Sequence, residues 1–194
     1  MLKPPIRNSG FTLVELMVTI VILAILLSIA VPSFQSTIAI NRLSAATNDL
    51  VASLAQARME ALRQGKRVTV CMSSSGTQCA TSSTWQQGWI SFTDITRSGA
   101  TANVDGGESI QSVAGAKPAG ISISGSGNTT QYISFGPDGR SWTMGDAAQT
   151  GTIRVCSTSS YLSNDSRARD LILTASGKIT MEPKTGVSSS CPAP

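Results

Sequence analysis

The chain has 194 residues, with 15 lysines and arginines against 11 aspartates and glutamates, and it contains no histidine. The formal charge is +4, and it falls to about +2 if Lys3 and Arg7 near the N-terminus are removed, which is too small to indicate nucleic acid or anionic lipid as a partner by itself. Catalysis needs a nucleophile beside a base, or paired carboxylates, and the scattered acids form neither arrangement. The length suits one membrane helix and one domain of about 130 residues. We therefore expect a protein that is not an enzyme and that carries no cofactor.

The first feature along the chain is an apolar run over residues 11–31, in which Glu15 is the only residue that can carry a charge. At the α-helical rise this run reaches roughly 31 Å, about the thickness of the hydrocarbon core of a bilayer. Lys3 and Arg7 precede it, and basic residues on one side of a span favour the cytoplasm. We expect a transmembrane segment at about residues 11–33, with everything after it outside the cytoplasm.

A small-residue step, Ser9-Gly10, lies before the apolar run, whereas an ordinary secretory signal peptide is cut after its apolar segment. Cleavage after Gly10 would remove a leader of residues 1–10 and leave Phe11 as the new N-terminus. The segment from Gly10 to Glu15 reads Gly-Phe-Thr-Leu-Val-Glu and resembles the type IV pilin-like proteins at every position. The resemblance implies that a prepilin peptidase cleaves between Gly10 and Phe11 and methylates the amine of Phe11.

Glu15 has two interpretations. A carboxylate at the centre of a membrane helix costs about 2.5–3.5 kcal/mol on insertion scales, which makes it a functional candidate. In the first interpretation Glu15 lies in the first helical turn, where the helix dipole favours an anion. In the second it pairs with the α-amine of Phe11, from its own chain or from a neighbour. The resemblance favours the neighbour: Glu15 would set the register in which subunits dock onto other minor and major pilins or pseudopilins at an inner-membrane assembly platform.

The helical pattern continues beyond the apolar run. Pro32 removes one backbone hydrogen bond and should bend or loosen the helix. After it, apolar residues recur at three- and four-residue steps, which is typical of one helix face; they are Leu43, Ala46, Leu50, Leu54, Ala57 and Ala61. Gly65 is a suitable C-terminal stop. We expect one helix over residues 11–64, apolar all round in its first half and apolar on one stripe in its second half.

After Gly65 the chain becomes rich in glycine, serine and threonine, and alternating patterns replace helical ones. The patterns predict strands at residues 67–72, 89–93, 109–113, 121–124, 132–135, 140–144, 152–156, 170–174 and 178–182. Such strands with glycine-rich turns indicate an antiparallel β domain over residues 65–194, covered by the helix stripe. The expected fold class is therefore α+β. We expect the loops 97–107 and 125–130 to be mobile because they lack apolar residues.

Four cysteines in an exported domain predict two disulfides, and four cysteines allow three connectivities. We favour Cys71 with Cys79 and Cys156 with Cys191, because these pairs close neighbouring segments. Zinc is the competing use of four cysteines. No CxxC spacing and no histidine are present, so we expect no metal site.

Two further segments narrow the resemblance. The segment 57–61, Ala-Arg-Met-Glu-Ala, and the segment 85–94, which contains Gly88-Trp89 and ends in Asp94, resemble the GspH/FimT-type minor pilins and pseudopilins. The resemblance implies a single-pass inner-membrane protein with its β domain in the periplasm, later incorporated into a filament. Its role would be to help initiate assembly of a type IV pilus, with the β domain at or near the tip. The alternatives are an H-type minor pseudopilin of type II secretion, a DNA-binding competence pilin and a surface adhesin.

DNA binding by some members of this group would require Gly-Arg-x-Arg on the last hairpin. This chain has Gly177-Lys178-Ile179-Thr180, so one of the two cations is missing. Phosphate contacts act roughly additively, and losing one of two cations weakens the case for DNA. If DNA is bound, we expect Lys178, Arg167 and Arg169 to contact it, within a loose basic edge that also includes Arg154 and Lys184.

The remaining candidates have ordinary structural explanations. Asp94, Asp105 and Glu108 form the one acidic grouping, but their spacing matches no EF-hand calcium loop. We expect them to be solvated loop acids. The tryptophans are expected to pack in the core or at a sheet edge rather than to form a ligand platform; they are Trp85, Trp89 and Trp142.

Overall fold

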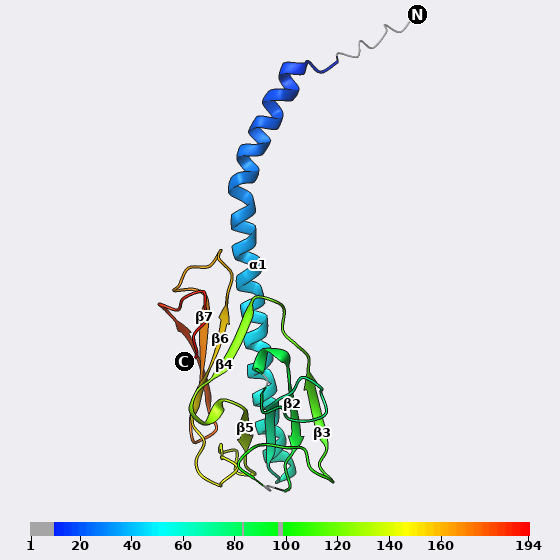
Figure 1. Ribbon diagram of the computed structural model, residues 1–194, viewed down its shortest axis with the longest axis vertical. Helices are drawn as coiled ribbons and strands as arrows, with labels where there is room; N and C mark the ends of the chain where they lie inside the picture. The colour runs from blue at the N-terminus through cyan, green and yellow to red at the C-terminus, as the bar shows by residue number, and fades with distance from the viewer. Residues whose placement is uncertain (1–9, 83, 97–98) are drawn as a thin grey trace, which may run out of the picture.

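The computed structural model describes residues 10–82, 84–96 and 99–194, so the predicted leader lies outside the described residues except for Gly10. One long helix, α1 (Leu13–Gln64), carries a β domain on its C-terminal half, and its N-terminal half projects away from the domain (Figure 1). The β domain consists of antiparallel sheets. The predicted α+β class, with a long N-terminal helix packed on antiparallel sheet, is confirmed.

Both ends of α1 are capped by the residues that the sequence places there. The Thr12 hydroxyl accepts a hydrogen bond from the Glu15 N–H at 3.2 Å, which satisfies one of the free donors of the first turn. Gly65 follows the last turn in the left-handed conformation, with φ of 63°, where a side chain would be strained. The helix is continuous through Pro32 and gently curved (Figure 1).

The β domain contains two four-stranded antiparallel sheets with the orders β3-β2-β1-β5 and β4-β6-β7-β8. The strands of the first sheet are β1 (Val68–Met72), β2 (Trp89–Thr93), β3 (Ile110–Ala114) and β5 (Tyr132–Phe135). Those of the second sheet are β4 (Ile121–Gly125), β6 (Gly151–Ser157), β7 (Ala168–Leu173) and β8 (Ile179–Lys184). The short 3-10 helices η1 (Trp85–Gln87) and η2 (Gly127–Thr129) precede β2 and β5.

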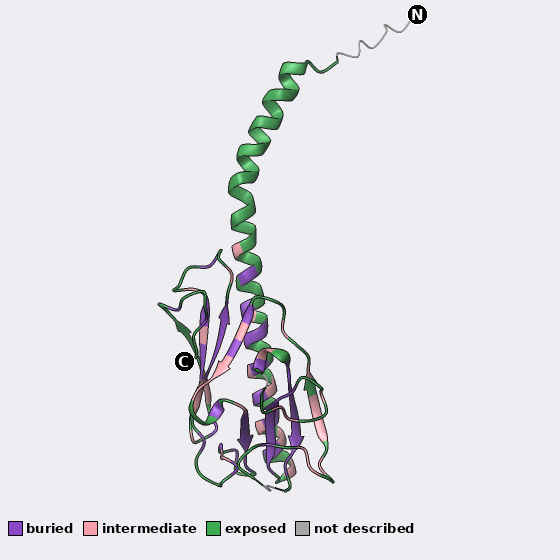
Figure 2. Cartoon of the chain, viewed as in Figure 1, coloured by how far each residue is buried: buried purple, intermediate pink, exposed green. Residues whose placement is uncertain are grey.

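The core lies between the C-terminal half of α1 and the two sheets (Figure 2). All six apolar residues of the predicted helix stripe are buried: Leu43, Ala46, Leu50, Leu54, Ala57 and Ala61. Side chains from both sheets meet this stripe, for example Val70 of β1 and Val155 of β6, each fully buried. Trp85 and Trp89 belong to the same core. A single helix therefore joins two sheets that share no strand.

The structure corrects two local predictions. The expected strand 140–144 is reduced to isolated bridges, which pair Phe135 with Ser141 and Trp142 with Ala148. The chain turns instead at Asp146, whose φ is 58°. The loop 125–130 is not loose, because Thr129 is fully buried and its hydroxyl donates to the Ser126 carbonyl at 2.8 Å. Short polar side chains can form hydrogen bonds with nearby backbone groups, and these bonds hold the loop in place although it lacks apolar residues.

Two disulfides hold the β domain, Cys71–Cys79 and Cys156–Cys191, with Cα–Cα distances of 5.5 and 5.7 Å. These are the two pairs that the sequence favours. The first closes a short loop after β1, and the second fastens the C-terminal tail to β6. The tail therefore belongs to the folded domain rather than trailing from it.

Candidate assembly site

The N-terminal half of α1 exposes an apolar surface that the β domain does not cover. We call residues 11–31 the apolar rod. Each of its large apolar side chains is at least half exposed, from 75% at Phe11 to 50% at Val31. Within the described chain, α1 is the one helix that is long and apolar enough to cross a membrane, judged by length and composition. A continuous apolar surface of this size needs a partner such as lipid or other apolar helices.

The three residues of the predicted processing and docking motif lie at the start of the rod or just before it. Gly10 and Phe11 are exposed and precede the first helical residue, Leu13. Glu15 lies in the first turn and is exposed, with its backbone bonded to the Thr12 hydroxyl. The structure thus places an accessible, non-helical Gly10–Phe11 bond one turn away from the one carboxylate of the rod.

Arg58 fastens the far half of α1 to the β domain. Its Nε donates to the Gly139 carbonyl at 2.8 Å, and its terminal nitrogen donates to the Ser176 carbonyl at 3.1 Å. Gly177 has a φ of +76°, and a Cβ there would lie 2.1 Å from the Gly139 oxygen. The two turns therefore close on each other over Arg58. Arg58 belongs to the segment that carries the family resemblance, but the sequence does not reveal this contact.

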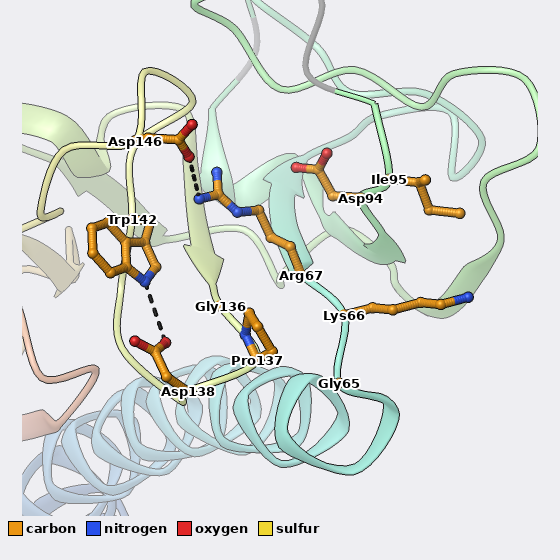
Figure 3. Close-up of a pocket in the computed structure, with 10 residues that line it drawn as sticks. All are labelled: Gly65, Lys66, Arg67, Asp94, Ile95, Gly136, Pro137, Asp138, Trp142 and Asp146. Carbon is orange, nitrogen blue, oxygen red and sulfur yellow. Dashed lines mark hydrogen bonds and ion pairs between the residues drawn. The ribbon is translucent and has the colours of Figure 1, made fainter.

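A pocket of about 610 Å³ opens at the end of α1 farthest from the rod (Figure 3). Arg67 donates to the Asp146 carboxylate at 2.8 Å and to the Thr143 carbonyl at 3.1 Å along one wall. On another wall the Trp142 indole donates to Asp138 at 3.3 Å. The lining therefore mixes charged, aromatic and apolar groups.

The acidic residues that line this pocket differ in their environment. Burial on its own would raise the pKa of Asp138, but hydrogen bonds from the Arg140 backbone and the Trp142 indole outweigh it and lower that pKa. Asp94 is only 4% exposed and accepts a hydrogen bond from the Thr69 hydroxyl at 2.6 Å. The expectation of a solvated acid is therefore wrong for Asp94. Across the described residues, no group of three or more metal-ligating side chains comes together.

The Glu108 carboxylate accepts hydrogen bonds from the backbone of Ile95 at 2.8 Å and Asp105 at 2.8 Å. Both Asp105 and Glu108 are partly exposed. Glu108 thus organises the described part of the loop between β2 and β3 by accepting hydrogen bonds from its backbone.

The predicted basic edge is also corrected. Arg154 is buried and donates twice to Asp170, at 2.7 and 2.9 Å. Hydrogen bonds to that carboxylate raise the pKa of Arg154, although burial opposes the shift. Arg167 is 4% exposed and donates to three backbone carbonyls. Arg169 is half-buried and Lys178 is exposed, so burial removes two of the five expected cations from the surface.

A long helix with an uncovered apolar half, a methylation-type start and antiparallel sheets on its other half defines a type IV pilin-like protein. The prokaryotic N-terminal methylation motif matches residues 6–31 of the chain. The family described as type II transport protein GspH matches residues 46–177, which is more than half of the chain. The chain belongs to the GspH family.

A solved structure has a similar fold. The chain is similar to a crystal structure of the type IV minor pilin FimU of Pseudomonas aeruginosa strain PAO1, with 19% identity and a TM-score of 0.51. That match covers 77% of this chain and 91% of FimU. A second crystal form of FimU gives 17% identity and a TM-score of 0.47, over 76% of this chain and 94% of that one. At 19% identity, the match to the first crystal form shows a shared fold. Comparison with curated proteins gives no significant match.

Proposed function

We propose that this protein is a minor pilin that helps to initiate assembly of a type IV pilus, in a structural and non-catalytic role. The observation that carries the proposal is the apolar rod, at least half exposed at each large apolar side chain and bearing one carboxylate in its first turn. A surface of this kind is stable in lipid or among similar helices, and filament assembly exchanges the first environment for the second.

The proposed pathway begins with processing. A prepilin peptidase removes residues 1–10 by cutting between Gly10 and Phe11, and it methylates the amine of Phe11. The helix of residues 11–64 then stays in the inner membrane through its segment of about residues 11–33, with the domain of residues 65–194 in the periplasm. The exposed, non-helical position of Gly10 supports cleavage at this bond.

Docking follows from the cost of a charge in an apolar environment. An unpaired carboxylate on an apolar helix is unfavourable in an apolar environment, so Glu15, in the first turn of the rod, is stabilised when a neighbouring subunit presents the amine of its Phe11. Apolar contacts between rods replace contacts with lipid. Glu15 therefore sets the register in which subunits dock, and the rest of the rod provides the apolar contact area between them.

A second candidate role is that of the H-type minor pseudopilin of a type II secretion system. The match to a family described as a type II transport protein favours it. A deletion strain separates the two roles: loss of twitching with normal enzyme secretion supports the pilus, and the reverse supports the secretion system.

The experiment that tests the proposed mechanism is Glu15→Ala in the full chain, with Thr19→Ala as the matched control in the same rod. We expect both variants to reach the membrane fraction in normal amounts. Glu15→Ala should be nearly absent from sheared filaments, while Thr19→Ala is incorporated normally. Normal incorporation of Glu15→Ala would remove the docking role from Glu15.

A further inference from the structure

The end of the β domain that faces the rod contains a small notch of about 140 Å³. Gln35, Ile38 and Arg42 of α1 form one side of it, and Gly120, Ser159 and Tyr161 form part of the other. Ser159 and Tyr161 belong to the loop between β6 and β7, which rises beside the helix at this end of the domain (Figure 1). We call this feature the rod-side notch.

The notch lies at the outer edge of the headgroup layer if the rod spans a membrane. Taking the membrane segment to end near residue 33, Ile38 lies about 7 Å beyond it and Arg42 about 13 Å beyond it at the helical rise. The headgroup layer is roughly 5–7 Å thick on each side of the hydrocarbon core. Helical side chains lean toward the N-terminus, so the long Arg42 side chain reaches back toward this layer.

The groups that line the notch suit a phosphate at such a surface. Arg42 is exposed, and none of the described residues accepts a hydrogen bond from it or pairs with it. Its planar guanidinium matches phosphate geometry in a bidentate way. Tyr161 is 51% exposed, and tyrosine is enriched at the membrane–water interface. The neighbouring cation Lys117 is instead engaged with Asp49 at 2.9 Å, so Arg42 is the cation that the notch offers.

The loop that carries Tyr161 is held in place from beneath. The buried Arg167 guanidinium donates to the carbonyls of Ser157 at 3.1 Å and Ser159 at 3.0 Å, and also to that of Leu162. Leu162 itself is buried. A loop braced in this way loses little conformational freedom when its tip binds, so Tyr161 can act as a fixed contact.

We propose that the rod-side notch binds the phosphate group of a phospholipid headgroup, so that the β domain rests on the membrane before assembly. This inference depends on the membrane anchoring in the proposed function. Arg42 binds the phosphate, Tyr161 inserts its ring among the headgroups, and Ile38 supplies an apolar contact at the outer edge of the headgroup layer. Extraction into a filament then releases these contacts together with the lipid around the rod.

The test uses the full chain in vesicles of equal parts phosphatidylglycerol and phosphatidylcholine, with a nitroxide on some headgroups. Tyr161→Trp reports docking, and Gln35→Trp reports anchoring of the helix itself. Wild-type protein gives the background, since Trp85 and Trp89 are buried and Trp142 lies in the pocket beyond the end of α1.

We expect the nitroxide to quench both introduced tryptophans. Adding Arg42→Gln to Tyr161→Trp should lower the docked-to-undocked ratio about fivefold, the effect of one cation at an anionic surface. Arg63→Gln, at the far end of α1, is the matched control and should leave the quenching unchanged.

Each other outcome overturns a defined part of the account. Quenching at residue 35 but not at residue 161 rejects docking and leaves anchoring intact, whereas quenching at neither rejects the anchoring itself. Equal quenching with and without Arg42→Gln rejects the phosphate contact. An Arg42-dependent response of Trp at position 161 to inorganic phosphate in detergent, as large as that to vesicles, makes the notch a free-phosphate site. Quenching that disappears as protein density rises assigns the notch to a second subunit.

Discussion

The two halves of α1 both carry large apolar side chains, but these side chains are exposed in the first half, and a stripe of them is buried in the second. In the apolar rod the large side chains are at least half exposed, whereas Leu43, Leu50 and Leu54 in the second half are fully buried. The rod is apolar around its whole circumference, and the second half is apolar along one stripe with polar residues opposite. An all-round apolar helix needs lipid or like helices, and a striped helix needs one covering surface. The pattern of apolar residues, rather than their number, therefore decides where each half resides.

This difference also separates the two kinds of stability in the molecule. The β domain obtains its stability from the stripe, the two sheets and the disulfides, none of which involves the rod. In the proposed function the rod contributes anchoring and assembly. Changes in one half should consequently leave the property of the other half unaltered.

The largest expected effect comes from truncating the same residue type in each half. Leu50→Ala should lower the free energy of unfolding of the β domain by about 3–5 kcal/mol, because it leaves a cavity in a fully packed site. Leu23→Ala, in the rod, should leave it unchanged. Guanidinium unfolding of both variants in detergent measures the difference. Equal losses would mean that the rod packs on the domain.

The disulfides give the next largest effect and should act within the β domain alone. Replacing Cys156 and Cys191 by serine should cost about 4 kcal/mol of unfolding free energy, and replacing Cys71 and Cys79 about 2.5 kcal/mol, because the longer loop gains more freedom when opened. The sequence separations are 35 and 8. Both variants should still fractionate with the membrane. Loss of membrane association in either would contradict the separation of the two halves.

The smallest effect lies at the solvated end of α1, at Glu60. A hydrogen bond from Arg63, reinforced by one from Gln64, lowers the pKa of Glu60 from its ordinary 4.5 to about 2. The charged form is therefore favoured by folding, so its small contribution to stability is complete above pH 4.5 and is lost as the pH falls toward 2. Carboxyl NMR of the labelled protein should show this titration, and Arg63→Gln should move it back toward 4.5. An unchanged titration in Arg63→Gln would reject Arg63 as the cause.

Much of the architecture follows from periodicity in the sequence. The stripe from Leu43 to Ala61, the stop at Gly65 and most strands are local patterns, and the favoured disulfides join segments close in sequence. The path of residues 140–144 cannot be predicted from a local pattern, because it depends on the turn at Asp146 and on the distant partner Arg67. An alternating strand pattern does not indicate a partner that is distant in the sequence.

The candidate sites also differ in whether they can be predicted from the sequence. Gly10, Phe11 and Glu15 form a contiguous motif and can be recognised in the sequence. The sequence predicts Arg154 and Arg167 at the surface, because a pattern of charges does not reveal which of them the fold buries. Only the fold places Arg154 opposite Asp170 on the adjacent strand. The rod-side notch joins residues such as Arg42 and Tyr161, which are more than one hundred residues apart in the chain. Such a site becomes visible only when the strands are placed.

The proposed function requires that cleavage before Phe11 releases an apolar rod that carries one docking carboxylate. Intact mass of the purified membrane-derived protein under non-reducing conditions tests it most directly. The purified protein should have the mass of residues 11–194 plus one methyl group, less the four hydrogens lost in forming two disulfides. A mass that still includes residues 1–10 would contradict it.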